Sequence, residues 1–473
     1  MNRLSRTLLL ASAAGFCLSG GTARAQTLQD ALISAYRNNP QLQADRARQR
    51  ATDEDVSRAW GGYRPQVVAQ AQTGRAFDNI IYPQQYQQIG FQNINDSRSP
   101  QVGALQITQQ IWDGNRTYAD VHHSKYAVQN GLQVLTSTEQ GVLGDAVQAY
   151  YDLYRDQQIL AIQNEYVASL REELKATEER YRVKDVTQTD VAQARARLAR
   201  GIADQQQYDG NVEASKSAFL RVVGFAPGNL PKPPPPPAAV PATLDESLVL
   251  AEKNPDLQAA IYAEKMAEAD VESAQSGLLP DLSLQASASH ATGNDQYRSV
   301  DTNGQVLLNL TVPLYDGGVA SAKTRAAKHT AGQRRLEIDQ ERDRIVDQVK
   351  RSWENLVAIQ ARIASLKENA KAADVALKGV QQEMRIGSRL VIDELNARQE
   401  VLDTQIALRR SEHDEAISAY SLLVACGRLT AKGLELPVEI YDPKAHYENV
   451  NWIPWGPWID TEYPESPKVK MNP

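Results

Sequence analysis

The sequence repeats itself over most of its length, and this duplication restricts the possible folds more than any other feature. Short motifs return in the same order at residues 27–32 and 243–248, Asn39-Pro40 and Asn254-Pro255, Trp112-Asp113-Gly114 and Tyr315-Asp316-Gly317, and Arg182 with Asp190 and Arg385 with Asp393. The offset is 215 before the first long helical segment (255 − 40) and 203 after it (316 − 113). Units this long exclude a short solenoid repeat. We expect two copies of one structural unit, residues 26–230 and 243–436.

The N-terminus has the pattern of an export signal. Arg3 and Arg6 precede the apolar run 8–18, and Ala23-Arg24-Ala25 fits a cleavage site, so residues 1–25 are predicted to be a signal peptide. Removing three arginines changes the formal charge from −7 to −10. An acidic exported chain is a poor nucleic-acid partner. The one remaining cysteine, Cys426, allows no internal disulfide.

Two segments carry a coiled-coil period. In residues 142–174 and 345–380, apolar residues recur every 3.5 positions on average, with Asp156 and Gln163 as polar members of the first series. No proline interrupts residues 114–178 or 317–383, so each is predicted to be one helix of roughly 65 residues and ~95–100 Å. Second helices are expected at 190–223 and 393–425, which gives each half a long helical hairpin.

Each half also contains two segments with alternating apolar and polar residues. They cover residues 66–71, 103–111, 281–288 and 305–314, with long polar loops predicted at 75–98 and 290–301. Alternation over about 10 residues fits a membrane barrel strand, although each segment alone fits a soluble hairpin equally well. Four strands in an exported chain favour the membrane. Four cannot close a barrel, because open edges do not occur in lipid, so two protomers would supply eight strands and three would supply 12.

A proline-rich stretch separates the two copies, and a second irregular stretch follows them. Residues 231–242 are predicted to form an extended polyproline linker that crosses the outside of the bundle. Residues 437–473 contain Trp452, Trp455 and Trp458 without a helical or strand period. This tail is predicted to be irregular, either packed on the bundle or disordered.

Together these residues resemble the TolC family of outer-membrane factors. The most specific features are the strand-to-helix corners Trp112-Asp113-Gly114 and Tyr315-Asp316-Gly317, and the hairpin turn with Gly387 followed by Asp393. The first copy departs from the family turn, because Lys184 replaces the glycine. The resemblance implies a mainly helical fold with membrane strands, a homotrimer with a 12-stranded barrel in outer-membrane lipid, and a helical periplasmic tunnel. It also implies two partners, a periplasmic adaptor protein and an inner-membrane ABC or RND transporter.

The resemblance places a periplasmic gate at the two hairpin ends. Its residues would be Thr189, Asp190, Arg389 and Asp393. In a trimer each aspartate forms a ring of carboxylates that attracts cations, and Arg389 would offset the repulsion. Alternatively the aspartates cap the returning helices, and both roles can hold. Met384 and Asn396 replace an aromatic and an acidic gate residue of the family, so the constriction is expected to be less acidic.

No catalytic or cofactor motif is found in the sequence. His122 and His123 are adjacent on a predicted helix and face different directions, and the other histidines are isolated. We therefore expect a passive export duct for type I secretion substrates or small molecules, without a cofactor and without enzyme activity. The alternative is a periplasmic adaptor or structural coiled-coil protein that has no barrel.

Overall fold

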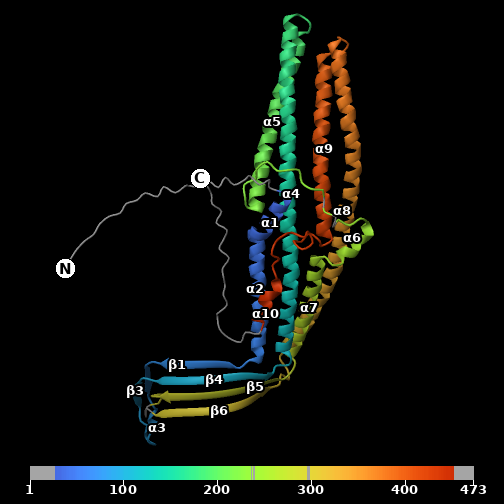
Figure 1. The fold of residues 1–473 in the computed structure, drawn as a ribbon. Helices are drawn as coiled ribbons and strands as arrows, with labels where there is room; N and C mark the ends of the chain where they lie inside the picture. Colours follow the sequence, from blue (N-terminus) through green and yellow to red (C-terminus); the bar gives the residue numbers. More distant parts are fainter. Residues whose placement is uncertain (1–26, 236, 238–239, 296–298, 452–473) are drawn as a thin grey trace, which may run out of the picture.

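The computed structural model describes residues 27–235, 237, 240–295 and 299–451. The predicted signal peptide and Trp452, Trp455 and Trp458 lie outside these residues. The chain forms a long helical bundle with a curved sheet at one end (Figure 1). Within the described ranges, no helix has both the length and the apolar content needed to cross a membrane.

The two repeats contain matching elements. The first has α1 (Leu28–Asn38), α2 (Pro40–Trp60), the short η1 (Gly61–Tyr63), β1 (Gln66–Thr73), β2 (Ala76–Ile80), α3 (Gln84–Gln87), β3 (Ile94–Arg98), β4 (Gln101–Trp112), α4 (Arg116–Arg182) and α5 (Gln188–Val223). The second has α6 (Leu244–Ala251), α7 (Pro255–Ser276), β5 (Asp281–Thr292), β6 (Val300–Thr311), α8 (Val319–Arg385) and α9 (Val391–Ala425), and α10 (Pro443–Val450) follows it. Both long helices have 67 residues, which confirms the predicted length.

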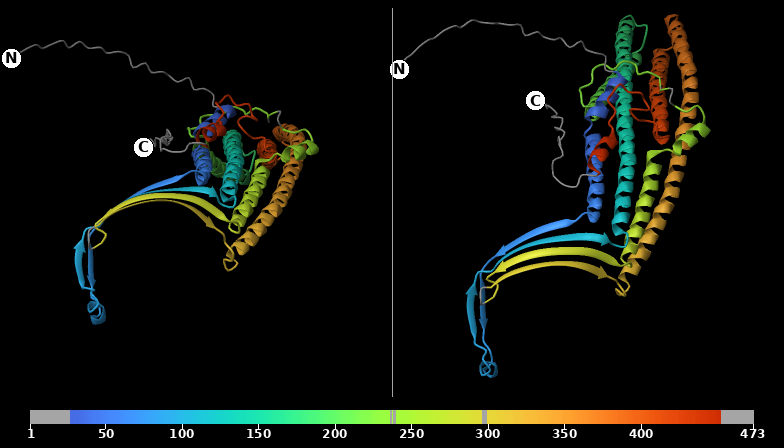
Figure 2. Two further views of the ribbon diagram at one scale, coloured as in Figure 1. Left: turned by 90° about the horizontal axis from the view of Figure 1, so that it is seen from below. Right: turned by 60° about the horizontal axis from the view of Figure 1, so that its bottom comes forward.

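The four long strands form one antiparallel sheet in the order β1-β4-β5-β6. The two repeats meet in its centre, where Leu105 of β4 lies opposite Ala288 of β5. The strands bend along their length as they leave the helices (Figure 2). Within the described part of the chain, β1 and β6 are the edges, and each has a side without a strand neighbour.

Three local expectations from the sequence are wrong. The region 75–98 is not only a loop, because β2 and β3 pair antiparallel and Arg98 forms ion pairs with Asp78 and Asp96. The stretch 290–301 is not only a loop, because β5 extends to Thr292 and β6 begins at Val300. The strand predicted at 305–314 starts and ends too late, since β6 ends at Thr311. The tail is not wholly irregular, because α10 forms there and contacts α2.

The apolar seams of α4 and α8 are largely buried, as the coiled-coil period of the sequence predicts. Helix α4 lies at the centre of the bundle. It contacts α2, α5, α7 and α9, and it has 23 buried residues, whereas α8, of equal length, has eight. The linker crosses this helix, where the Tyr150 and Tyr151 hydroxyls donate to the carbonyls of Pro231 and Pro234. Because only eight residues of α8 are buried, much of the surface of this helix is exposed in the single chain.

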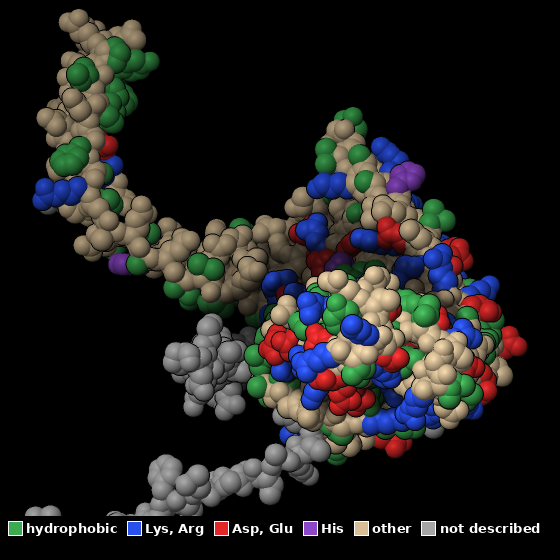
Figure 3. All heavy atoms as spheres, turned by 90° about the horizontal axis from the view of Figure 1, so that it is seen from above, with side chains coloured by type: hydrophobic (Ala, Val, Ile, Leu, Met, Phe, Trp, Pro, Cys, Tyr) green, Lys and Arg blue, Asp and Glu red, His purple; other side chains and the backbone are tan. Residues whose placement is uncertain are grey.

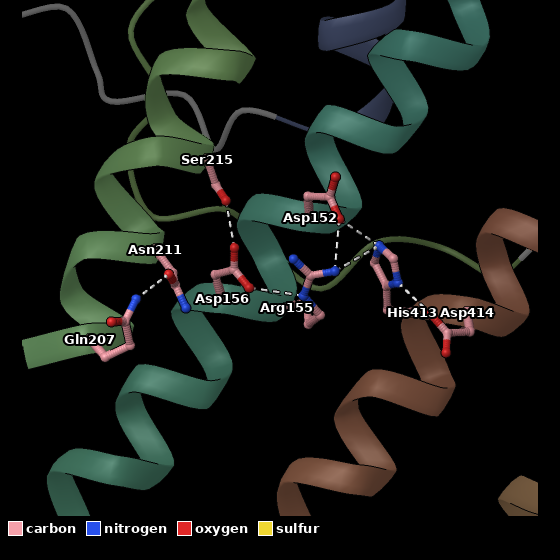
Figure 4. Close-up of polar contacts among 8 residues, drawn as sticks. All are labelled: Asp152, Arg155, Asp156, Gln207, Asn211, Ser215, His413 and Asp414. Atoms are coloured by element: carbon pink, nitrogen blue, oxygen red, sulfur yellow. Dashed lines mark hydrogen bonds and ion pairs between the residues drawn. The ribbon is translucent and has the colours of Figure 1, made fainter. Parts of the chain in front are cut away.

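The polar members of the first seam, Asp156 and Gln163, are buried, and each forms hydrogen bonds. Ser215 of α5 donates to Asp156, and Arg155 binds Asp156 and Asp152 at 2.8 Å each (Figure 4). His413 of α9 lies 2.8 Å from Asp152, so the cluster joins the two hairpins. Burial, the largest influence, raises the pKa of Asp152, but His413 and Arg155 together outweigh it and lower the pKa. Gln163 donates to the carbonyl of Gly201 at 2.9 Å.

Candidate gate at the hairpin ends

The turns α4–α5 and α8–α9 lie at the same end of the bundle, opposite the sheet (Figure 1). This brings all four predicted gate residues to one end of the molecule. Viewed toward that end, the bundle carries many basic and acidic side chains, whereas the sheet carries few (Figure 3). The hairpin ends are therefore the polar, solvated part of the molecule.

The two turns have the same backbone geometry. After α4, the Asp185 N–H donates to the Arg180 carbonyl at 2.9 Å. After α8, the Ser388 N–H donates to the Glu383 carbonyl at 3.0 Å, which is the same bond 203 residues later. Both helices end with a residue in the left-handed region, Lys184 with φ 66° and Gly387 with φ 80°. Lys184 thus adopts a conformation that favours glycine, and the two copies differ in side chain but not in backbone.

Replacing Lys184 with glycine is expected to stabilise the protein. A side chain in the left-handed region costs about 1–2 kcal/mol, and glycine costs about 0.5–1 kcal/mol in backbone entropy, so the net gain is up to about 1 kcal/mol. The midpoint of thermal unfolding should rise. The control is Lys175→Gly, at an exposed position within α4, and it should lower that midpoint. A lower midpoint for Lys184→Gly would contradict the argument.

Both gate aspartates cap helices, which confirms the capping alternative. Asp190 accepts the Thr187 N–H at 2.8 Å, and Thr187 accepts the Asp190 N–H in return, so α5 begins with a capping box. Asp393 accepts the Leu390 N–H at 3.2 Å at the start of α9. Thr189 is exposed in the first turn of α5. The capping role leaves one oxygen of each carboxylate available for other partners.

Within one chain, the ion-pair partner of Arg389 is a glutamate, and the role of this arginine beside rings of aspartates in a trimer stays a prediction. Its guanidinium binds Glu383 of α8 at 2.8 Å, with both side chains about half exposed, and not Asp393. Glu383 lies six residues before Arg389, and the turn folds it back into reach. Glu383, first through the hydrogen bond and then through its charge, raises the pKa of Arg389, with a smaller contribution from Asp393.

A buried charged cluster next to the turns was missed in the sequence. Arg398 of α9 binds Glu394 at 2.6 Å and approaches Glu173 of α4 to 3.9 Å, and Gln381 of α8 donates to Glu394 at 3.0 Å. Glu394 and Glu173 are both buried. Burial and then the charge of Glu394 raise the pKa of Glu173. One arginine therefore holds two buried carboxylates from both hairpins, and the spacing of Glu394 and Arg398 was the signal available in the sequence.

Two further hydrogen bonds connect the hairpins. Arg197 of α5 donates to Asn396 of α9 at 2.9 Å, and Tyr166 of α4 donates to Gln399 of α9 at 2.8 Å. Met384 packs against the apolar cluster of this region, which includes Leu395 and Tyr166. The amide at 396 thus binds a cation from the neighbouring hairpin, and we call the Arg398 cluster and these two bonds the latch.

At the opposite end of the long helices, the predicted corners connect strand to helix. Trp112 ends β4, and Asp113 accepts the Thr117 N–H at 2.8 Å at the start of α4. Asp316 accepts the Gly318 and Ala320 N–H groups at 2.9 and 2.6 Å before α8. Gly114 and Gly317 have φ 67° and 73°, so the chain turns through a conformation that excludes most other residues. Tyr315 is largely exposed.

A sheet with two unpaired edges, exposed apolar side chains and a rod of paired helices defines a membrane channel protein with a helical extension. The family described as "Outer membrane efflux protein" matches residues 31–224 and 249–428. The outer membrane efflux protein BepC of Brucella suis is 33% identical over 444 residues, which is 92% of this chain and 93% of BepC. The chain belongs to the outer membrane efflux protein family, the TolC family.

Other known proteins agree with this assignment. The alkaline protease secretion protein AprF of Pseudomonas aeruginosa is 25% identical over 427 residues, which is 86% of each chain. The crystal structure of the Campylobacter jejuni CmeC outer membrane channel has a TM-score of 0.77 at 16% identity, and the match covers 90% of this chain and 89% of CmeC. This likeness supports the fold.

Family membership settles several expectations from the sequence. The resemblance to the TolC family and the mainly helical fold are confirmed, and the chain is an outer-membrane channel for efflux or secretion. The family consists of transport proteins and not enzymes. The alternative of a periplasmic adaptor or structural coiled coil is therefore wrong.

Proposed function

We propose that three copies of this chain form one exit duct, with a shared 12-stranded barrel and a periplasmic helical tunnel. The observation that carries the proposal is the pair of open sheet edges, β1 and β6. Backbone groups on an open edge cannot be left unpaired in lipid. Pairing β6 of one chain with β1 of the next removes every edge when the ring closes.

The apolar surface of the strands and of α8 supports this assembly. On β6, Val306, Leu308 and Leu310 are each at least 64% exposed, as expected for side chains that face lipid. On α8, Leu336 is 70% exposed and Val375 is 69% exposed. Apolar side chains on the sparsely buried helix would pack against the neighbouring chain, so the same ring covers both the strand edges and the helices.

The hairpin ends would form the gate of this duct. Around a threefold axis, Asp190 and Asp393 would each give three carboxylates near the entrance, with Thr189 beside the first ring and Arg389 beside the second. The latch would hold the hairpins of each chain together while the gate is closed. Opening would then require the separation of α9 from α5, at Arg197 and Asn396, and from α4, around Arg398.

The duct would work with two protein partners, a periplasmic adaptor and an inner-membrane ABC or RND transporter that supplies the energy. Its cargo would be small molecules or type I secretion substrates. BepC is named an efflux protein and AprF a protease secretion protein, and the identities of 33% and 25% favour small molecules as the main cargo.

The experiment that tests the assembly measures its mass and its conductance. Full-length mature protein, extracted from outer membranes in detergent, should have the mass of three chains by native mass spectrometry and should resist dissociation on unheated gels. In planar bilayers it should form channels of one conductance class. Two or four chains per particle would overturn the trimer, and a monomer that forms no channels would overturn the shared barrel.

A further inference from the structure

The chain that follows the second repeat crosses back to the first repeat. The Ala431 N–H donates to Glu139 of α4 at 2.7 Å, and the Tyr441 N–H donates to the Tyr36 hydroxyl of α1 at 3.0 Å. Residues 428–450 thus lie on α1, α2 and α4, and α10 runs alongside α2 (Figure 1). We call residues 428–450 the strap.

The strap follows one line of residues along α2. The Arg46 guanidinium lies 4.9 Å from the ring centroid of Tyr441, and His446 lies 3.1 Å from the buried Asp53. Arg46 and Asp53 are one heptad apart, so they share a face of the helix. Residue numbers increase in the same direction along the strap and along α2. The next position on this line, seven residues after Asp53, is Trp60.

An aromatic recess lies at Trp60. Its volume is about 330 Å³, and it is lined by Trp60, Tyr63, Tyr118, Val121, His122 and Lys125. The Tyr118 and His122 rings lie 4.3 Å apart, and the Lys125 ammonium lies 5.5 Å from the Trp60 ring centroid. Tyr63 is 46% exposed and Tyr118 is 50% exposed. This volume is at the low end of the range of about 300–1,000 Å³ for small-ligand pockets, so it fits one or two side chains.

The strap ends within reach of this recess. From Asp53 to Trp60 is seven helical residues, or about 10.5 Å, and from His446 to the end of α10 at Val450 is four, or about 6 Å. The remaining ~4–5 Å is less than the reach of about two extended residues. The next residues are Trp452-Ile453-Pro454-Trp455-Gly456-Pro457-Trp458, which contain half of the six tryptophans of the chain.

The duplication provides an internal comparison for the recess. At the offsets of 215 and 203, its residues correspond to Gln275, Leu278, Ser321, Thr324, Arg325 and Lys328. The second copy therefore has no aromatic side chain there, although α8 has the same length and the same ends as α4. The aromatic set occurs only in the copy on which the strap lies. Folding of the repeat unit alone does not require it.

We propose that residues 452–458 dock tryptophan side chains in the recess formed by Trp60, Tyr63, Tyr118 and His122 of the same chain. Indole rings bury large apolar area and stack favourably on aromatic and histidine rings, and Lys125 adds a cation beside them. The docked segment would fasten the C-terminus of the chain to the joint between α2, the sheet and α4. The first copy would then be held by a C-terminal segment, and the second copy would have no equivalent contact.

Cysteine crosslinking in the full-length protein tests this proposal. In a Cys426→Ala background, Lys125→Cys is combined with Ile453→Cys or Gly456→Cys, which leaves all the tryptophans in place. Lys328→Cys, the equivalent position on α8, is the matched control. We expect one of the tail cysteines to crosslink to position 125 within one chain about tenfold faster than to position 328, because docking raises the effective concentration.

A second variant separates docking from mere proximity. Tyr118→Ser with His122→Arg places the residues of the second copy in the recess, and the crosslinking rate at position 125 should fall about tenfold toward the control. The midpoint of thermal unfolding, measured on the same variant, checks that it folds. Equal rates at positions 125 and 328, a rate unchanged by the exchange, or a crosslink between chains would each overturn the proposal.

Discussion

Replacing Arg398 with methionine is expected to open the hairpin ends and raise the single-channel conductance. The substitution leaves Glu394 and Glu173 buried without their cation, since Arg398 binds Glu394 at 2.6 Å and lies 3.9 Å from Glu173. Removing one partner of a buried ion pair costs about 3–5 kcal/mol. If this loss falls on the closed arrangement, the ratio of closed to open channels drops by a factor of about 10² to about 5 × 10³. Planar-bilayer recordings measure the effect.

Two variants control this experiment. Arg195→Met removes an ion pair with Glu178 whose arginine is 70% exposed and whose glutamate is 42% exposed, so its cost should stay below about 1 kcal/mol. Arg398→Met with Glu394→Leu replaces the buried pair with apolar groups and should restore much of the closed state. Equal conductance in Arg398→Met and wild-type protein would show that the cluster does not hold the gate.

The same cluster predicts how the gate responds to pH. The pKa of Glu173 is raised above the usual range of a glutamate in the packed arrangement, by burial and then by Glu394. A carboxyl group with a raised pKa favours the packed state when it is protonated, so packing gains stability as pH falls toward that pKa. Conductance should therefore decrease as pH falls from neutral toward the ordinary titration range of a glutamate, and Glu173→Gln should reduce the dependence.

Replacing Gly114 with alanine is expected to damage the corner between β4 and α4 severely. A Cβ atom at this position would lie 2.8 Å from the Leu279 Cβ and 2.8 Å from the Ser276 carbonyl oxygen. The left-handed backbone conformation adds about 1–2 kcal/mol, and overpacking adds about 1–3 kcal/mol. Because Ser276 and Leu279 belong to the second repeat, the change also separates the two copies where the sheet begins.

Gly317→Ala is the matched control, since Gly317 is the same residue of the second copy. Its φ is 73°, but an added Cβ would meet no atom within 4 Å. The free energy of unfolding of this variant should fall only by the cost of a left-handed backbone conformation, about 1–2 kcal/mol. The measurements are the midpoint of thermal unfolding and the yield of heat-resistant oligomer in outer membranes. An equal loss for both variants would show that the contact with Leu279 has no effect.

The sequence predicted the elements whose signals repeat regularly. The seam of α8, with Ile345, Val349 and Leu356, is buried as its period required, and the strand and helix order followed from the duplication. The β2–β3 hairpin was missed because its strands lack alternation, and Arg98 of β3 holds them together through Asp78 of β2, a charge distant in sequence. Local patterns do not show such pairs.

At the gate, the capping role of Asp190 and Asp393 was predictable, because acidic residues at helix starts accept backbone N–H groups. The partner of Arg389 was not, because Asp393 and Glu383 are both near in sequence and only the path of the turn selects Glu383. The burial of Glu394 depends on the packing of α4, α8 and α9, which no local pattern encodes.

The equal length of α4 and α8 constrains how this protein can change over evolution. Each added residue lengthens a helix by about 1.5 Å and rotates the rest of that helix by about 100°, so a change in α4 alone would move one hairpin end out of level with the other and break its seam. Insertions and deletions should therefore survive only in matched pairs, in steps of seven, and in α5 and α9 as well. The position of the gate along the bundle thus depends on a helix length that both copies must share.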